Sequence, residues 1–302
     1  MNINKIISIM ERRGFLRWIP TEMYLKLRYW RLTGHKLDLE NPKLYTEKLQ
    51  ALKLKYANSS NLPQYTVMAD KIKAKEYVGR VLGEEYIIPT LGIWDCYEKI
   101  DFDALPDKFV LKTNHDSGGV VVCSNKAKLD KKKARIKLTK SLKRNFYWYG
   151  REPQYRDIKP KIFAEQFMQN SEQGLHDYKV WCFNGKALYT QYITGRMGSE
   201  TFEAFYDRDW NKQDFTYHNP LMTGNVPRPE KLKELLNCAE RLAVGLPFAR
   251  VDFYVLEDET IKFGEITFFP MSGYQKWEPE EMNLVVGEML NIDDQIRQEN
   301  SV

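Results

Sequence analysis

The chain has 302 residues, of which 43% are hydrophobic and 29% charged. This composition is typical of a soluble globular enzyme and excludes a disordered chain, and the length indicates two domains or one composite unit with a small extra module. No segment approaches the roughly 18 consecutive apolar residues of a membrane span. The apolar run at 6–10 is too short, and too soon followed by charges at 11–13, to predict a secretory signal.

The cysteines give no sign of a metal site or a disulfide framework. None of them forms a CxxC pair, and none is spaced from the four histidines as metal ligands usually are. Reduced, structural cysteines in a cytoplasmic protein are therefore expected. The four are Cys96, Cys123, Cys182 and Cys238.

The formal charge of +5 is unevenly distributed along the sequence. Residues 126–144 contain ten Lys or Arg against the single acid Asp130, and residues 12–36 mix basic residues with Trp and Tyr. A solvated helix face explains the first segment, and a surface for an anionic polymer or for phospholipid head groups is the alternative. Peripheral association with a membrane through these segments stays open. No recognised nucleic-acid module accompanies them, so no nucleic-acid partner is expected.

Hydrophobic spacing predicts a helical N-terminal region that carries no strand. One helix begins at Pro20-Thr21 with Met23, Leu27 and Trp30 on one face, and residues 58–64 form a loop. The other elements predicted up to residue 164 are helices at about 45–56, 68–74 and 128–145 and strands at 86–89, 108–113, 119–123 and 161–164.

The second half of the chain is predicted to be mainly strands. The Asn184-Gly185 turn joins strands 177–183 and 187–193 in an antiparallel hairpin. A helix at 229–245 precedes strands 249–256 and 260–268. Mixed helices and strands with a central hairpin predict an α+β fold.

Two features in these strands suggest chemistry. Lys112 stands inside an apolar strand and precedes the polar, glycine-rich loop 114–119, whereas the usual phosphate-binding loop has its lysine after the glycines. Asp252 and Glu265 are built into two successive hydrophobic strands joined by a hairpin. Such carboxylates could share one Mg²⁺, or Asp252 could form a structural ion pair, for example with Arg250.

The order of these residues resembles the ATP-grasp superfamily, and the local sequence resembles its TupA-like (teichuronopeptide biosynthesis) family. The similarity runs from about residue 20 to about residue 290 and is carried by NPKLYTEKLQ, ADKIKAKEYV, DALPDKFVLKTNHDSGG, REPQYRDIKP, HDYKVWCFNGK, FYDRDW and RVDFYVLEDETIKFGEITFFP. The resemblance implies an ATP-grasp fold, in which two α+β subdomains clasp ATP. The expected domains are a helical N-terminal region at 1–65, a first subdomain with the phosphate lid at 66–165 and a second with the metal site at 166–302.

The resemblance also implies a nucleotide site. Lys71 and Lys112 would hold phosphate oxygens, the loop 114–119 would be the flexible lid, and the segment from Glu165 would contact adenine. Asp177 would bond the ribose hydroxyls, and Lys179 could reach the phosphates. The residues expected to bind ATP are Lys71, Lys112, Ser117, Gly118, Gly119, Glu165, Phe167, Met168, Asp177 and Lys179.

The same resemblance implies the metal and catalytic residues. Asp252 and Glu265 match the magnesium ligands, while Thr267 stands where many ATP-grasp enzymes have Asn, and its hydroxyl is a weaker ligand. The residues expected to act in catalysis are Arg250, Lys112 and Arg196, and those expected to contact substrate are His115, Asp116, Arg151 and Tyr155.

A carboxylate–amine ligase that works through an acyl phosphate is the activity this family implies. It would join an amino acid or amine to a uronic acid of a bacterial surface or capsular polysaccharide, or of a lipid-linked precursor, with ATP and Mg²⁺. The expected location is the cytoplasm, including the inner face of the membrane. Two alternatives stay open: a kinase-like phosphotransferase acting on a glycan, and a glycan-binding accessory protein encoded with glycosyltransferases.

Overall fold

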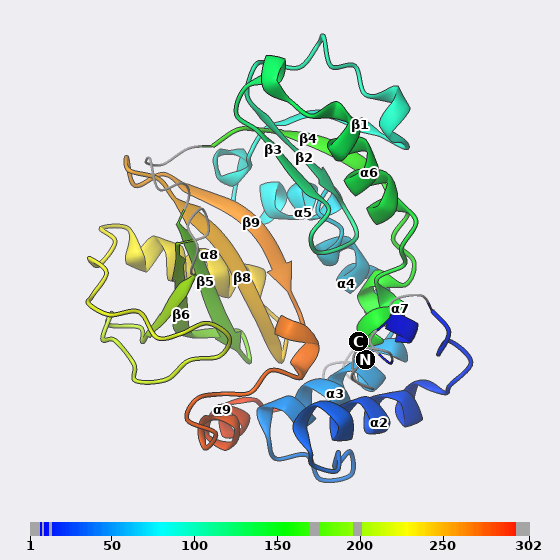
Figure 1. Ribbon diagram of the computed structural model, residues 1–302. Helices are drawn as coiled ribbons and strands as arrows, with labels where there is room; N and C mark the ends of the chain where they lie inside the picture. The colour runs from blue at the N-terminus through cyan, green and yellow to red at the C-terminus, as the bar shows by residue number, and fades with distance from the viewer. Residues whose placement is uncertain (1–6, 8, 12–13, 169–175, 196–200, 294–302) are drawn as a thin grey trace. The chain divides into compact units, whose positions relative to one another are not determined.

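The computed structural model describes residues 7, 9–11, 14–168, 176–195 and 201–293 (Figure 1). The chain divides into two compact units, one formed by residues 60–169 and the other by residues 1–59 together with 170–302. Each unit contains its own antiparallel sheet. Within the described ranges, every helix is too short or too polar to span a bilayer.

The unit of residues 60–169 contains a four-stranded sheet in the order β1-β4-β2-β3. Every neighbouring pair in it is antiparallel. Its strands are β1 (Thr90–Trp94), β2 (Phe109–Thr113), β3 (Val120–Cys123) and β4 (Ile162–Gln166). Its helices are α4 (Leu62–Ala69), α5 (Lys73–Val81), α6 (Lys131–Leu142) and α7 (Tyr147–Gly150), with short 3₁₀ turns at Glu84–Tyr86, Tyr97–Lys99, Lys126–Lys128 and Pro153–Tyr155.

The two faces of β2 explain how a lysine fits an apolar strand. Phe109 and Leu111 are fully buried in a core that includes Leu138 of α6. Successive side chains of a strand point to opposite faces, so Lys112 lies on the other side of the sheet, away from this core. The strand therefore buries one apolar face and presents a cation on the other.

The unit of residues 1–59 and 170–302 contains a five-stranded sheet in the order β7-β6-β5-β8-β9. Its strands are β5 (Asp177–Phe183), β6 (Lys186–Thr194), β7 (Phe202–Tyr206), β8 (Phe248–Val255) and β9 (Ile261–Thr267). Asn184 and Gly185, with φ of 49° and 77°, make the expected tight turn between β5 and β6. Its helices are α2 (Thr21–Thr33), α3 (Tyr45–Ala57), α8 (Leu232–Leu242) and α9 (Met282–Met289), with a short turn at Pro270–Gly273.

An aromatic cluster joins α3 to the five-stranded sheet. Tyr45 at the start of α3 is fully buried, and its ring centroid lies 5.4 Å from that of Phe248 and 6.0 Å from that of Trp181. Tyr29 of α2 exchanges a 2.8 Å hydrogen bond with Thr46 of α3. The N-terminal helices are thus part of the same core as the strands that follow residue 170.

Several predicted elements differ from those observed. The strand expected at 86–89 begins instead at Thr90, because Pro89 has no N–H to give to a ladder. The helix expected at 68–74 is two helices, since α4 ends at Ala69 and Asp70 Oδ1 then accepts the N–H of Ile72. Strand β7 was not predicted. Met23, Leu27 and Trp30 share one face of α2 as predicted; that face is exposed, and the opposite face is buried.

Candidate active site

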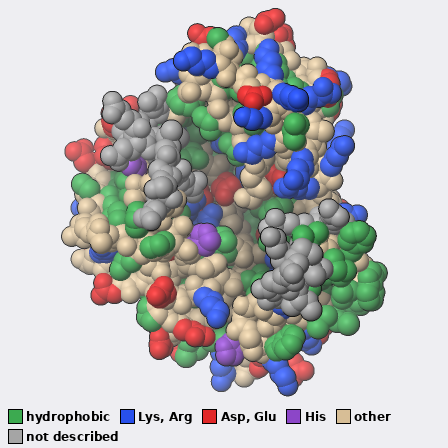
Figure 2. Space-filling view, in the orientation of Figure 1, with side chains coloured by type: hydrophobic (Ala, Val, Ile, Leu, Met, Phe, Trp, Pro, Cys, Tyr) green, Lys and Arg blue, Asp and Glu red, His purple; other side chains and the backbone are tan. Residues whose placement is uncertain are grey.

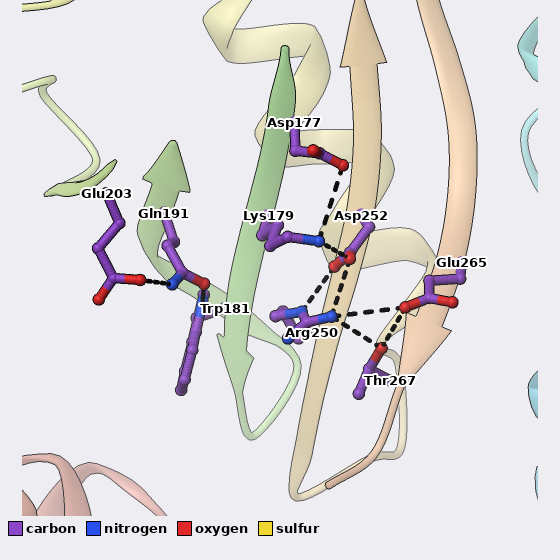
Figure 3. Close-up of polar contacts among 9 residues, drawn as sticks. All are labelled: Asp177, Lys179, Trp181, Gln191, Glu203, Arg250, Asp252, Glu265 and Thr267. Carbon is purple, nitrogen blue, oxygen red and sulfur yellow. Dashed lines mark hydrogen bonds and ion pairs between the residues drawn. The ribbon is translucent and has the colours of Figure 1, made fainter. Parts of the chain in front are cut away.

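Strands β5, β8 and β9 bring charged side chains to one face of the five-stranded sheet (Figure 3). Lys179 of β5 pairs with Asp252 of β8, which pairs with Glu265 of β9, so these three residues lie in one row across the sheet. Arg250 and Thr267 form the adjacent pair of β8 and β9. The alternation of side chains along each strand then places all five on the same side.

Asp252 is the centre of this group. It is only 4% exposed, and a carboxylate buried to this degree needs partners. Arg250 supplies two hydrogen bonds, from Nε to Oδ1 at 2.7 Å and from Nη2 to Oδ2 at 2.8 Å. Lys179 Nζ donates to Oδ2 as well. Both oxygens of Asp252 therefore accept hydrogen bonds from cationic groups, an arginine fork and an ammonium.

Arg250 also connects Asp252 to β9. Its Nη2 donates to Thr267 Oγ1 at 3.1 Å and lies 3.5 Å from Glu265 Oε1. The Thr267 hydroxyl in turn donates to Glu265 Oε1 at 3.2 Å. The side chain of Glu265 is 35% exposed, which makes it the more accessible of the two carboxylates.

Asp177 extends the group at the start of β5. Its Oδ1 lies 3.8 Å from Lys179 Nζ, so this lysine bridges Asp177 and Asp252 (Figure 3). Both members of the Asp177–Lys179 pair are buried. The cluster thus combines three acidic and two basic side chains on adjacent strands.

A second charged cluster lies in the unit of residues 60–169. Glu165 of β4 accepts from Lys112 of β2 at 2.5 Å and from Lys75 of α5 at 2.7 Å. Burial alone would raise the pKa of Glu165, but the two ammonium groups outweigh it and lower the pKa. Burial also lowers the pKa of Lys75, and Glu165 opposes that effect. The cluster carries two cations for one anion.

The glycine-rich loop after β2 is held by hydrogen bonds of its own residues. Asp116 accepts from Thr113 Oγ1 at 2.5 Å and from Ser141 Oγ of α6 at 2.5 Å. A side chain at Gly119 would collide with this network, whereas Gly118 has a φ of 97° and open space around it. Lys71 donates its backbone N–H to the Asn114 carbonyl at 3.0 Å, which places the start of the loop beside Lys71.

A scan of protein-family models gave one decisive match. The model described as TupA-like ATPgrasp matches residues 47–291, more than half of the chain. The chain belongs to the TupA-like ATP-grasp family. The expected family and α+β ATP-grasp fold are therefore confirmed. No curated protein matches the chain.

Solved structures with a similar fold include several ligases. An L-amino acid ligase from Bacillus licheniformis is 15% identical with a TM-score of 0.42, over 68% of this chain and 44% of that one. A D-alanine-D-alanine ligase from Coxiella burnetii is 14% identical with a TM-score of 0.43, over 78% of this chain and 60% of that one. This chain matches less than two thirds of either structure, and likeness at this level carries no argument about substrate.

The charged row suits the metal that ATP-grasp enzymes are expected to use. Asp252, Glu265 and Thr267 offer only oxygen donors, which Mg²⁺ prefers, and Mg²⁺ usually takes one or two carboxylates together with substrate phosphates and water. No group of three or more His, Cys, Asp or Glu side chains suited to a metal occurs among the described residues.

The remaining ATP-grasp candidates have varied surroundings. His115 and Asp116 are 2% and 3% exposed, and His115 Nε2 lies 3.2 Å and 3.1 Å from the carbonyl oxygens of Ser141 and Arg144. These contacts give both residues a structural role in the loop and do not support the expected contact with substrate. Arg151 is also buried, with its guanidinium 4.6 Å from the centroid of the Trp148 ring.

The other expected ATP-grasp residues stand apart from the two charged clusters. Phe167 and Met168 directly follow β4 and are partly buried, and Lys108 Nζ lies 5.9 Å from the Phe167 ring centroid. Tyr155 packs on Phe146, with ring centroids 5.1 Å apart. Ser117 is exposed in the loop. Arg196 lies outside the described residues.

Sequence reasoning missed Lys75, the second cation on Glu165. Lys75 is four residues after Lys71, and its Nζ also donates to the Ile88 carbonyl at 2.7 Å. The sequence Asp-Lys-Ile-Lys-Ala-Lys has a lysine at every second position, at 71, 73 and 75. Only the break between α4 and α5 decides which of them faces β4.

Proposed function

We propose that the protein is an ATP-dependent carboxylate–amine ligase. The observation that carries this proposal is the row Lys179–Asp252–Glu265 with Arg250 and Thr267, on the three adjacent strands β5, β8 and β9. Within an ATP-grasp chain, this row offers both the oxygen donors for magnesium and the cations for a phosphoryl group. A protein that only bound a nucleotide or a glycan would not need both carboxylates.

The nucleotide would be held mainly by cations and backbone groups. Lys71 and Lys112 are suited to phosphate oxygens as compact point charges, and the loop 114–119 can supply backbone N–H groups. Phe167 and Met168 would border adenine, Asp177 would accept from the ribose hydroxyls, and Lys179 would approach the phosphates. Glu165 already has two ammonium partners, which supports a role in fixing Lys112 besides any contact with adenine.

The reaction would proceed in two displacements. A carboxylate oxygen of the substrate attacks the γ-phosphorus of ATP, the bond to the bridging oxygen breaks, and ADP leaves. The amine nitrogen then attacks the acyl carbon, inorganic phosphate leaves, and one amine proton passes to solvent. Arg250 stabilises the negative charge that develops in both steps. Arg196 is a further candidate for this charge.

A magnesium ion bound through Asp252 and Glu265, with Thr267 as a third candidate, would supply charge neutralisation at the phosphates. Lys179 and Arg250 now occupy both oxygens of Asp252. A metal ion at Asp252 would therefore have to share these oxygens with Lys179 and Arg250 or displace one of them.

For the substrate we propose a uronic acid of a bacterial surface or capsular polysaccharide, or of its lipid-linked precursor, with an amino acid as the amine. The support is the family itself and the exposed lysines of α6, which suit an anionic uronate polymer. Figure 2 shows Lys and Arg side chains gathered in the upper right, where Figure 1 draws α6. We place the reaction in the cytoplasm, where ATP is available.

The test is product analysis by mass spectrometry. Incubation with ATP, Mg²⁺, a uronic acid oligosaccharide and mixed amino acids should yield ADP, inorganic phosphate and an amide. A stable phosphoester without amide would establish the phosphotransferase alternative instead, and no ATP consumption with any acceptor would favour a binding protein.

The metal assignment has its own test. Asp252→Asn and Glu265→Gln keep the side-chain size and remove the charge, and each should lower ATP consumption at least about a hundredfold, as expected for the loss of a preorganised charge at the transferring phosphoryl group. Glu257→Gln, an exposed acid between β8 and β9, is the matched control and should retain activity. Full ADP formation in the Asp252→Asn, Glu265→Gln double variant would rule out these residues as metal ligands.

A further inference from the structure

Helix α2 carries large apolar side chains on both its buried and its exposed face. Its inner face buries Leu25 and Tyr29 in a core with Tyr274. Its outer face carries Met23, Leu27 and Trp30 at helical spacing, and these side chains are 50%, 48% and 60% exposed. Large apolar side chains gathered on an exposed surface often mark a site of interaction with a protein or a membrane.

The segment before α2 enlarges this apolar surface. Phe15 is 60% exposed and Trp18 is 77% exposed. Of the seventeen large hydrophobic side chains exposed in the described part of the chain, eight lie within residues 9–32. Figure 2 shows hydrophobic side chains gathered at the lower right, over the dark-blue N-terminal segment of Figure 1. We call this surface, formed by Phe15, Trp18, Met23, Leu27 and Trp30, the α2 face.

The N-terminal sequence that includes the α2 face is rich in basic residues. Residues 1–36 contain eight Lys or Arg and only two acids, a formal charge of +6 where the whole chain has +5. Both acids have basic partners. Glu11 is buried 2.7 Å from Arg31, and Glu22 lies 2.6 Å from Lys26. Arg17 and Lys36 are exposed near the ends of α2.

We propose that the α2 face docks the protein on the surface of an anionic phospholipid membrane. Trp is enriched where a protein meets the boundary between head groups and acyl chains, because its ring is apolar and its N–H is polar. Basic residues beside such an apolar face are attracted by anionic lipids, and together these features describe a helix that lies in the membrane interface.

A second copy of this chain is the less favourable occupant. Pairing two α2 faces would bring two segments of charge +6 together, and like charges that face each other across an interface oppose association. A membrane surface offers the opposite charge. The proposal does not depend on the reaction assigned to the active site.

The experiment is sedimentation of the full chain with lipid vesicles. The protein should bind vesicles of phosphatidylcholine with phosphatidylglycerol, bind vesicles of phosphatidylcholine alone at least about tenfold more weakly, and detach as salt screens the charges. The double variant Trp18→Ser, Trp30→Ser should lose at least about tenfold in affinity for the anionic vesicles. The variant Arg17→Gln, Lys36→Gln should be less sensitive to salt.

The matched control removes an exposed hydrophobic side chain elsewhere. Val244 follows α8 and is 72% exposed, so Val244→Ser should leave vesicle binding unchanged. Thermal unfolding of each variant checks that it is folded. Absence of binding to anionic vesicles at low salt would overturn the proposal, as would unchanged binding by the tryptophan double variant. A concentration-dependent dimer that this double variant abolishes would show a second copy to be the occupant and would equally overturn it.

Discussion

Glu165 illustrates how a single buried carboxylate can organise a cationic site. Lys112 and Lys75 both lie within 2.7 Å of it, and its pKa is lowered in spite of burial. An ammonium that is hydrogen-bonded to a fixed anion loses side-chain freedom before any ligand arrives, so less entropy is lost on binding phosphate. We therefore expect Lys75 to contribute to nucleotide binding through its position as well as its charge.

Replacing Lys75 by Met tests this role. The variant leaves Glu165 with Lys112 alone and removes one cation, so KM for ATP should rise about tenfold, the equivalent of about 1.4 kcal/mol. Lys73→Met is the matched control, because Lys73 is exposed on the same helix α5. The measurement is ATP consumption as a function of ATP concentration. Equal KM values for Lys75→Met and the unchanged protein would contradict the role.

Residue positions could be predicted from the sequence where the strand pattern alone orients the side chain. Asp252 and Glu265 could be placed together because adjacent antiparallel strands put alternate residues on one face. The partner of Asp252 was also foreseen, since Arg250 was the named alternative. Lys75 could not be found, because its orientation depends on where α5 begins, and a one-residue change would turn it away from β4.

At the scale of elements, α3 supports the turn that follows β9. Lys53 of α3 is fully buried, and its Nζ donates to the carbonyl and the hydroxyl of Ser272, at 2.8 Å and 3.1 Å. Met271 and Ser272 both have positive φ, of 49° and 57°, which is unfavourable for residues other than glycine. Gln50 holds the same turn through a 2.9 Å bond to the Gly273 carbonyl.

The variant Lys53→Met should destabilise this arrangement. Methionine fills similar space, but the buried oxygens of Ser272 lose a charged donor, and the free energy of unfolding should fall by about 1–3 kcal/mol. Chemical denaturation of the full chain measures this change. Lys26→Met on the exposed side of α2 is the control and should have little effect. If both variants unfold at the same denaturant concentration as the unchanged protein, α3 does not support the turn in the way described.

The boundaries of elements were less predictable than their existence. The hairpin of β5 and β6 was found because Asn184-Gly185 dictates its turn. The break at Asp70 was missed, since the apolar spacing continues across it and only a side-chain hydrogen bond ends the helix. Met23, Leu27 and Trp30 were correctly predicted to lie on one face of α2. Periodicity alone cannot say whether the core covers this apolar face or the other one.

At the scale of the whole molecule, the two charged clusters belong to different compact units. Lys112 and Glu165 lie in the unit of residues 60–169, and Arg250, Asp252 and Glu265 lie in the other. The order of motifs along the chain suggested that both clusters take part in one reaction. No local sequence pattern could establish this shared role. When two residues that act on the same transition state are both removed, the loss of activity is smaller than the product of the two separate losses.

A double-mutant cycle with Lys112→Met and Asp252→Asn tests this joint action. Each single variant should lower kcat/KM for ATP about a hundredfold or more. The double variant should be little less active than the more impaired single variant, because the second change removes an interaction that is already lost. The control cycle pairs Asp252→Asn with Lys73→Met, whose effects should add because Lys73 is exposed and outside both clusters. Losses that multiply in the Lys112 cycle as they do in the control would show that the clusters act independently, and the ligase mechanism would then have to be assigned to one of them.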